Sequence, residues 1–203
     1  NAYSNKAVKK IYTLKKRPIN NPSIIHYSSL KQLKKDCELN KNFFILYKKF
    51  CPGPITFVLK LKKENRISKI ATNNKKTVAI RFPKNRITQK LLKTLNYPLA
   101  APSANISTKI SPVSASDVRE EFGNKIKFVL NGGRSKIGLE STIISLVNRP
   151  KILRLGGIEK SKISKVLNKN IKYERTNKKI SVPGQSKLHY SPGIPIKLNA
   201  KKS

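Results

Sequence analysis

The chain has 203 residues, enough for one substantial domain, and its 45 basic residues against 9 acidic residues give a formal net charge of +36. Apolar residues make up 37% of the sequence in short runs, none near the roughly 18 residues that cross a bilayer, so we expect no membrane partner. Two cysteines, Cys37 and Cys51, are too few for a disulfide framework or a zinc site. The composition therefore predicts a globular protein in a reducing, cytoplasmic setting.

The positive charge has two interpretations. Only nine of the 45 basic residues are arginine, and the lysine excess comes with many asparagines and isoleucines, as the codons of an AT-rich genome would supply. The excess charge would then lie at exposed sites without a function. The other interpretation is attraction to polyanions such as RNA or ATP. Charge alone leaves both open.

The beginning of the chain is unusual because the sequence contains no methionine. It opens on the polar stretch Asn1 to Ser4, which is typical of the start of a helix, with no signal peptide before it. We therefore expect a fragment or a processed form whose first element is missing.

Short helices and strands alternate along the first half of the chain. A helix is predicted over residues 4–16, where Ala7, Ile11 and Leu14 share one face and Ser4 is the N-cap. Pro18 ends this helix. The further expected elements are a strand at 23–27, a helix from Ser28 or Ser29 to about 39, a rigid turn at 51–54, strands at 56–61 and 77–82, and a helix at about 88–95.

The second half continues this alternation and then loses it. The expected elements are a strand and tight loop over 99–105, a helix from Ser114 or Ser116 to Phe122, a strand at 128–130, a hairpin of 141–147 with 151–154, and a helix at about 161–167. This pattern indicates an α/β or α+β domain with a mixed sheet over residues 1–169. Residues 170–203 lack periodicity and are predicted to be a linker or C-terminal arm.

Familiar catalytic and metal motifs are missing from the sequence. The two histidines, His26 and His189, lie far apart in the chain, so no metal ligand is predicted. The sequence has no obvious carboxylate pair, nucleophile elbow, Walker loop or dinucleotide-binding glycine motif. Most familiar hydrolases and P-loop enzymes are thereby excluded.

Polar residues occur where a folded core would favour apolar ones. Arg81 ends a buried-looking strand, and an unpaired guanidinium is costly to bury, so Arg81 either pairs with a carboxylate or awaits an anionic ligand. The same argument applies more weakly to Arg154, which ends the short run 151–154. Ser103 and Asn105, in a tight loop, either present polar groups to a ligand or form an ordinary turn.

Three further features also have two interpretations each. The cluster of Lys15, Arg17 and Asn21 after the first helix is either a phosphate grip or a solvated helix end. Ser141 at the start of a strand either lines a pocket or makes cross-strand hydrogen bonds, and His26 in an apolar strand is more often a core residue than a catalyst. Together, basic, hydroxyl and amide groups with few carboxylates indicate a site for an anionic substrate, with phosphoryl or adenylyl transfer promoted by positioning and electrostatics. Mg²⁺ would then be held mainly by the nucleotide phosphates.

Short motifs in a fixed order carry a family resemblance. They are Lys15-Lys16-Arg17-Pro18, Asn21-Pro22-Ser23-Ile24-Ile25-His26, Pro52-Gly53-Pro54-Ile55-Thr56, Val78-Ala79-Ile80-Arg81-Phe82-Pro83, Ala101-Pro102-Ser103-Ala104-Asn105, Ser111-Pro112, Gly132-Gly133, Glu140-Ser141-Thr142-Ile143, Leu153-Arg154 and His189-Tyr190-Ser191-Pro192. This succession, from residue 1 to about 195, resembles the YrdC-like family of L-threonylcarbamoyladenylate synthases.

The resemblance implies a fold and a reaction. The fold would be a twisted mixed β-sheet flanked by helices around a positively charged concave site. The reaction is that of a nucleotidyltransferase, which forms threonylcarbamoyl-AMP and pyrophosphate from L-threonine, bicarbonate or CO2, and ATP with its Mg²⁺. The product would serve N6-threonylcarbamoyladenosine formation at position 37 of tRNA through a downstream tRNA threonylcarbamoyltransferase complex, and the resemblance leaves direct contact with RNA or tRNA open.

Motif matching also implies roles for individual residues. Lys15 and Arg17 would be the catalytic cations. The residues implied for threonine are His26, Arg81, Ser103 and Ser141. The residues implied for ATP are Lys15, Arg17, Asn21, Thr77, Asn105, Val113 through its backbone, Arg154, His189 and Tyr190.

The two ends of the chain depart from the family pattern. The His189-Tyr190 segment marks longer members, in which a linker crosses the nucleotide site to a second domain, and we expect that domain to be absent here. The family strand expected before Asn1 is also missing, which would leave an unpaired sheet edge.

Two other function classes stay open. One is a basic RNA-binding module without catalysis. The other is carbamoyl transfer as in hydrogenase-maturation enzymes, which carry an acylphosphatase domain and zinc-finger cysteines that this chain lacks.

Overall fold

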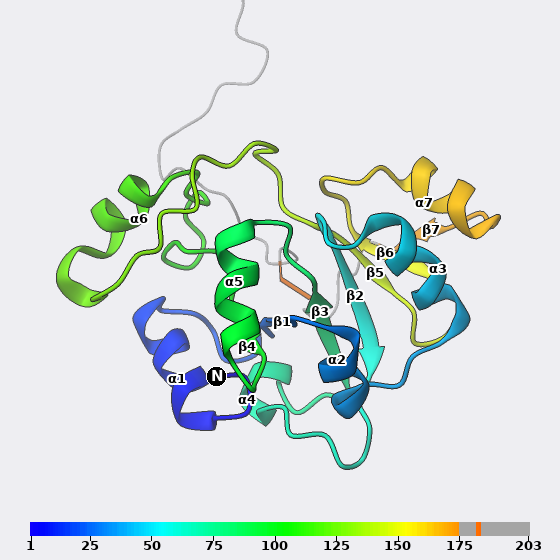
Figure 1. The fold of residues 1–203 in the computed structure, drawn as a ribbon, viewed down its shortest axis with the longest axis horizontal. Coiled ribbons are helices and arrows are strands. Elements are labelled where there is room, and N and C mark those ends of the chain that lie inside the picture. The colour runs from blue at the N-terminus through cyan, green and yellow to red at the C-terminus, as the bar shows by residue number, and fades with distance from the viewer. Residues whose placement is uncertain (175–181, 184–203) are drawn as a thin grey trace, which may run out of the picture.

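The central feature of the computed structural model, which describes residues 1–174 and 182–183, is a single mixed β-sheet. Its strands are β1 (Ile24–His26), β2 (Ile55–Lys60), β3 (Thr77–Arg81), β4 (Leu99–Ala100), β5 (Thr142–Ser145), β6 (Lys151–Arg154) and β7 (Lys172–Tyr173). Across the sheet they are arranged in the order β4-β1-β3-β2-β5-β6-β7 (Figure 1).

Parallel and antiparallel pairs alternate across this sheet. The pairs β1–β3, β2–β5 and β6–β7 are parallel, whereas β4–β1, β3–β2 and β5–β6 are antiparallel. The expected mixed sheet of an α/β domain is thus confirmed, and the β5–β6 pair is the expected hairpin. β7 begins at Lys172, past the boundary expected at 169, so the sheet continues into the segment assigned to the arm.

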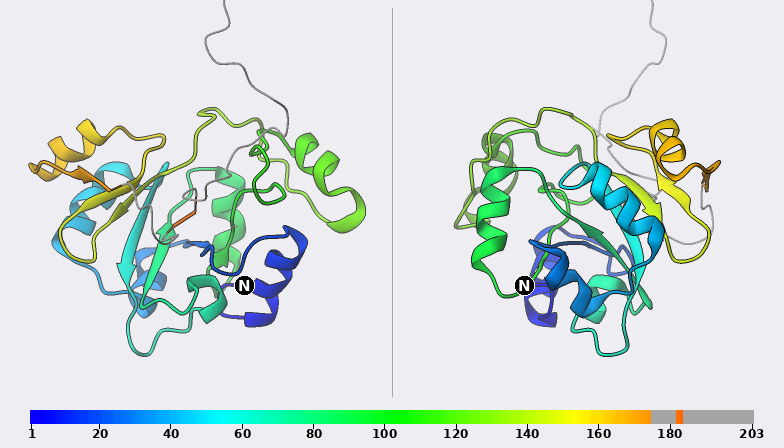
Figure 2. Two further views of the ribbon diagram at one scale, coloured as in Figure 1. Left: turned by 180° about the vertical axis from the view of Figure 1, so that it is seen from behind. Right: turned by 45° about the vertical axis from the view of Figure 1, so that its right-hand side comes forward.

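Helices flank the sheet. They are α1 (Asn5–Leu14), α2 (Leu30–Asp36), α3 (Lys41–Phe50), α4 (Lys69–Thr72), α5 (Arg86–Thr94), α6 (Ala115–Phe122), the 3₁₀ turn η1 (Gly123–Lys125) and α7 (Lys160–Leu167). Figures 1 and 2 show α6 and α7 at opposite ends of the molecule. The predicted helices correspond to α1, α2, α5, α6 and α7, whereas α3 and α4 were not predicted.

Side-chain caps determine where several helices begin. In each case a hydroxyl or amide oxygen accepts the backbone N–H of the residue three positions later, which satisfies a donor that the helix itself leaves unpaired. The capping residues are Ser4, Ser29, Asn40, Asn85 and Ser114. Ser4, Ser29 and Ser114 were among the predicted caps. Within the described residues, none of the helices combines the length and apolarity needed to cross a membrane.

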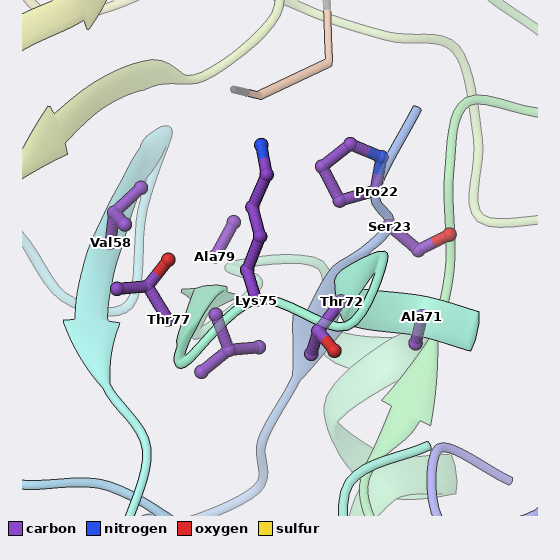
Figure 3. A pocket seen from close by; sticks show the side chains of 9 residues that line it. Pro22, Ser23, Val58, Ala71, Thr72, Lys75, Thr77 and Ala79 are labelled. Carbon is purple, nitrogen blue, oxygen red and sulfur yellow. The ribbon is translucent and has the colours of Figure 1, made fainter. Parts of the chain in front are cut away.

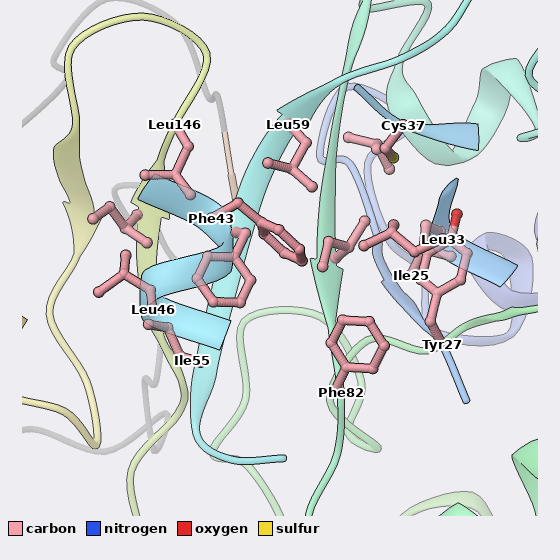
Figure 4. Close-up of a cluster of buried hydrophobic side chains, with 14 of the residues drawn as sticks. Ile25, Tyr27, Leu33, Cys37, Phe43, Leu46, Ile55, Leu59, Phe82 and Leu146 are labelled. Carbon is pink, nitrogen blue, oxygen red and sulfur yellow. The ribbon is translucent and has the colours of Figure 1, made fainter. Parts of the chain in front are cut away.

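One face of the sheet carries the main hydrophobic core. Because side chains alternate along a strand, every second residue points to this face, including Ile25, Phe57, Ile80 and Ile144, all of which are fully buried. Buried residues of α1, α2, α3, α4 and α7 pack against them. Figure 4 shows Phe43 and Leu46 of α3 lying over β2 with Ile55 and Leu59.

The opposite face of the sheet carries a smaller apolar cluster. The strand residues in it are Ile24, Val58, Ala79, Ile143 and Leu153, and Val182 packs on them. Val182 is 1% exposed, so the described pair Val182–Pro183 lies against this face although it is distant in sequence. This face carries the candidate functional residues that lie on or next to the strands, including Thr77, Arg81 and Ser141.

The strand predicted at residues 128–130 is wrong. Within residues 1–174 this segment belongs to no strand, and Phe128 and Leu130 are 89% and 59% exposed. An apolar triplet becomes a strand only where a neighbouring strand supplies hydrogen bonds and cover, and the segment after η1 lies outside the sheet. It leads instead into the connection to β5.

Candidate functional site

Polar side chains from neighbouring strands share the sheet face opposite the main core. Thr77, Ala79 and Arg81 alternate along β3 and therefore point the same way, and Ala79 belongs to the apolar cluster of this face. On the adjacent strand β1, His26 is the register partner of Arg81. Two residues implied for threonine thus lie side by side.

The environment of Arg81 is short of negative charge. Its Nε donates a hydrogen bond to the carbonyl oxygen of Gly53 at 3.2 Å. Burial lowers the pKa of Arg81, and the positive charge of Arg154 lowers it further. Among the described residues no carboxylate forms an ion pair with Arg81. The guanidinium is therefore suited to an anionic ligand.

His26 is a neutral imidazole at physiological pH. Burial, and secondarily the charge of Arg81, lowers its pKa from 6.5 to about 4. Its Nδ1 is buried and has no hydrogen-bond partner among the described residues. His26 is therefore able to accept or donate a hydrogen bond without adding charge.

Ser141, just before β5, lies on the same face within a hydrogen-bond network. Its Oγ is 2.7 Å from the Oγ1 of Thr56 on β2, and both residues are essentially fully buried. Arg154 donates from Nη2 to the Ser141 carbonyl oxygen at 2.8 Å and to Oγ at 3.1 Å, and from Nε to the carbonyl oxygen at 3.1 Å. The network fixes the positions of both Ser141 and Arg154.

Arg154 also contacts the C-terminal part of the described chain. Its Nη1 donates to the carbonyl oxygen of Pro183 at 3.2 Å, next to the buried Val182. The chain therefore returns across the candidate site at this point. His189 and Tyr190, implied for ATP, lie outside the described residues.

A second group of candidate residues lies after the C-terminal end of α1. Lys15 is 4% exposed, and its Nζ donates to the carbonyl oxygen of Ser103 at 2.6 Å and to that of Asn105. Burial, followed by the charge of Arg17, lowers the pKa of Lys15 to about 8, against an opposing effect of Glu121. The Lys15 amine thus joins α1 to the loop that follows β4.

Arg17 and Asn21 are joined by two hydrogen bonds. Arg17 donates from Nε to the Asn21 carbonyl oxygen at 3.0 Å and from Nη2 to Asn21 Oδ1 at 2.6 Å. A third bond runs from Nη2 to the Pro22 carbonyl oxygen at 2.8 Å. The guanidinium also lies 5.7 Å from the ring centre of Tyr12. These contacts hold Arg17 beside the segment that enters β1.

The loop that follows β4 presents one exposed and one buried candidate. Ser103 is exposed, whereas Asn105 is 6% exposed and donates from Nδ2 to the carbonyl oxygens of Ile106 and Lys109 at 2.9 and 2.7 Å. Asn105 Oδ1 has no partner among the described residues. The Asn105 side chain therefore shapes the loop from within, while the Ser103 side chain faces outward.

A small hollow of about 10 Å³ lies between the segment that enters β1 and strand β3 (Figure 3). Pro22, whose carbonyl oxygen is bonded to Arg17, lines it together with Thr77 of β3. In the same view the Lys75 side chain extends between Val58 and Pro22. Thr77 thus lies across this hollow from the segment that Arg17 holds, at the other end of β3 from Arg81.

Val113 lies apart from these groups. Its N–H donates to Asp117 Oδ2 at 2.8 Å, and its carbonyl oxygen accepts the N–H of Ser135 at 2.7 Å. Both backbone groups therefore serve the cap of α6 and the 128–140 segment. The described candidates thus form one group on the sheet face and one after α1, and the hydrogen bonds of Val113 lead to neither.

Residues that the sequence analysis did not assign complete the site. Gly53 accepts from Arg81, Thr56 contacts Ser141, and Gly156 packs so tightly that a Cβ would lie 2.3 Å from the Glu140 carbonyl oxygen. Gly53 and Thr56 belong to the motif Pro52-Gly53-Pro54-Ile55-Thr56, so the sequence did contain a pattern that could have identified them. Gly156 follows Leu153-Arg154, but its close contact depends on how β6 returns past Ser141.

The candidate side chains are mostly cations, hydroxyls and amides, a set that suits anionic ligands. Within residues 1–174 and 182–183 no group of three or more histidines, cysteines or carboxylates could hold a metal ion. Arginine, lysine, hydroxyl and amide groups do meet here. Such groups can orient two anionic reactants and offset charge that develops between them.

Comparisons with known proteins identify the family of this chain. The sequence model of the Sua5_yciO_yrdC family, described as "Telomere recombination", matches residues 1–156. Threonylcarbamoyl-AMP synthase of Pyrococcus abyssi is 39% identical over 202 residues, which cover 97% of this chain and 59% of that protein. The protein of the same name from Bacillus subtilis is 37% identical, with 97% and 58% covered. The chain spans under three fifths of the length of these curated relatives.

Solved structures of similar proteins share the fold of this chain. The crystal structure of P. abyssi Sua5 complexed with L-threonine matches with a TM-score of 0.88 at 38% identity, covering 94% of this chain and 57% of that one. The crystal structure of E. coli YciO matches with a TM-score of 0.67 at 23% identity, over 77% of this chain and 76% of that one. At this identity the match shows a shared fold and nothing more.

Proposed function

Because this chain belongs to the Sua5–YciO–YrdC family, we propose that it is the catalytic domain of an L-threonylcarbamoyladenylate synthase. The observation that carries the proposal is that His26, Arg81 and Ser141, from three separate motifs, come together on one sheet face. The 38% identical relative that was crystallised with L-threonine supports the substrate. These findings favour the synthase over an RNA-binding module without catalysis.

The threonine end of the site lies around Arg81. The guanidinium, which lacks a carboxylate partner in the described part of the chain, would bind the threonine carboxylate. His26 and Ser141 would add neutral hydrogen bonds, and Ser103 would approach from the exposed loop. A neutral His26 is important, because a second cation beside Arg81 would oppose the positively charged amine of the incoming amino acid.

The ATP end lies toward Arg17. Arg17 and Asn21 are held beside the hollow that Thr77 lines, and Arg154 is held by Ser141. The threonine amine would take up CO2 as a carbamate, and a carbamate oxygen would displace pyrophosphate from the α-phosphorus. Arg17 and Arg154 would then offset the charge on the phosphates. The described residues offer no cage for a metal, so Mg²⁺ would arrive bound to the ATP phosphates.

The proposed partners follow from this reaction. ATP, L-threonine and bicarbonate are the substrates, and the product would pass to a tRNA threonylcarbamoyltransferase complex in the cytoplasm. The large positive charge would also favour contact with tRNA.

The direct test is product formation. The chain is incubated with ATP, Mg²⁺, L-threonine and labelled bicarbonate, and threonylcarbamoyl-AMP is sought by mass spectrometry. We expect labelled product from the wild type and from Arg86→Ala, an exposed arginine at the start of α5, but not from Arg81→Ala. Absence of product from folded wild-type protein would refute the proposal, and undiminished product from Arg81→Ala would refute the site.

A further inference from the structure

We infer that Lys15 is a positioning residue, whose amine fixes the loop of Ser103 and Asn105 and leaves contact with the nucleotide phosphates to Arg17. This inference rests on the proposed function. It assigns different roles to two cations that are only two residues apart in the sequence.

The hydrogen bonds of Lys15 run to the loop. Its Nζ donates to the carbonyl oxygens of Ser103 and Asn105, and its own carbonyl oxygen accepts the N–H of Ser107 at 2.8 Å. One lysine thus makes contacts from both its backbone and its side chain with a segment about 90 residues away. Two of the three ammonium hydrogens are used in these bonds.

Burial and neighbouring charge also favour this role. Lys15 is 4% exposed, so its amine reaches the loop through the protein interior. The charged groups that act on it are the guanidinium of Arg17 on its own segment and the carboxylate of Glu121 on α6. Glu121 itself accepts the Ile106 N–H at 3.0 Å and pairs with Lys109 at 3.4 Å. The loop is therefore held from two sides, by Lys15 and by Glu121.

Arg17 is better placed to contact a ligand. It is partly exposed, its bonds to Asn21 and Pro22 use Nε and Nη2, and Tyr12 contacts the guanidinium as well. The bonds to the backbone and side chain of Asn21 and to Pro22 leave Nη1 uncommitted to that segment. A guanidinium anchored through one edge keeps a preorganised pair of donors for an oxyanion.

Substrate kinetics separate the two roles. Lys15→Met is compared with Lys10→Met, the same substitution at an exposed position of α1. If Lys15 positions the loop, the KM values for threonine and for ATP both rise by about tenfold or more, because Ser103 and Asn105 shift together. Lys10→Met should leave both unchanged. A rise in the ATP KM alone would overturn the inference.

The wild type provides a test that needs no variant. A neutral Lys15 amine keeps two hydrogens and can still donate to both carbonyl oxygens. If Lys15 instead contacted the phosphates, deprotonation would remove the positive charge that binds them. With Lys15 titrating near pH 8, ATP binding measured calorimetrically at about pH 7 and about pH 9 should change by less than about threefold. A loss of about tenfold or more would contradict the positioning role. This comparison remains valid if Lys15→Met fails to fold.

Hydrogen exchange distinguishes failure of this inference from failure of the proposed function. The Ser107 amide should exchange at least about tenfold faster in Lys15→Met than in Lys10→Met, with no substrate present. Equal exchange rates would refute the positioning role even if the enzyme is active. Faster exchange in a protein that makes no product would leave the positioning role standing and remove only the synthase proposal.

Discussion

His26 and Arg81 face each other as register partners on the parallel strands β1 and β3, so an imidazole and a guanidinium share one position of the sheet surface. Burial and the arginine charge keep the imidazole neutral. The pair therefore combines one positive charge with one neutral hydrogen-bonding group. That combination suits a zwitterionic amino acid, whose carboxylate needs the cation and whose amine would be repelled by a second one.

Replacement of Arg81 by lysine should impair threonine binding although the charge is kept. Lysine lacks the planar fork that binds a carboxylate through two donors, and it cannot reproduce the bond from Nε to Gly53. We expect the threonine KM to rise by about tenfold or more, with a smaller change in the ATP KM. Arg86→Lys at an exposed position is the control. An unchanged threonine KM in Arg81→Lys would argue against this carboxylate contact.

His26 should make folding stability depend on pH. Its pKa is about 6.5 when unfolded and about 4 when folded, so below pH 6.5 the unfolded chain binds a proton that the folded chain does not. The free energy of unfolding should thus be unaffected by His26 above pH 6.5 and fall as the pH drops toward 4. Urea titrations of wild type and His26→Gln at several pH values test this. Identical slopes for both proteins between pH 6.5 and pH 4.5 would contradict it.

The sequence predicted most of the elements but not how they meet. Strand alternation and N-cap residues such as Ser4 and Ser29 are local signals, and the structure has these elements where they were expected. α3 was missed although Asn40 caps it and Phe43 and Leu46 supply its buried face, so its signal was present in the sequence. The failed strand at 128–130 shows that an apolar run needs a neighbour, which local sequence does not reveal.

The site shows the same division between local and non-local information. Motif matching named Arg81 and His26, but their pairing depends on β1 and β3 being neighbours although β2 lies between them in the chain. The contacts of Lys15 with the loop beyond β4 could not be read from a basic cluster at a helix end. Such contacts require the three-dimensional path of the chain.

The bond between Thr56 and Ser141 should matter for both stability and threonine binding. Thr56→Val keeps the shape but removes the hydroxyl that lies 2.7 Å from Ser141 Oγ in a fully buried position. Loss of one buried partner costs about 1–3 kcal/mol of unfolding free energy. Because Arg154 still contacts Ser141, we expect folding to persist while the threonine KM rises. Denaturant titration and steady-state kinetics provide the two readouts, and wild-type values in both would show the bond to be dispensable.

Gly156 should tolerate no side chain. A Cβ there would lie 2.3 Å from the Glu140 carbonyl oxygen and 2.6 Å from the Ser141 carbonyl carbon, which are backbone atoms that cannot move without shifting Ser141. At the next residue, Gly157, a Cβ would meet the Pro54 side chain at 3.1 Å and Ile137 at 3.4 Å, contacts that side-chain adjustment can relieve.

Gly156→Ala should therefore lower the unfolding free energy by about 3 kcal/mol or more, and Gly157→Ala by clearly less. The displaced Ser141 should also raise the threonine KM in whatever Gly156→Ala protein folds, because the hydrogen bonds from Arg154 and Thr56 converge on that residue. Thermal unfolding and threonine kinetics of the two variants are compared side by side. If the two alanine variants were equally stable, the prediction would be wrong, because the backbone at Glu140 would then move aside for a Cβ at residue 156 at little cost in free energy.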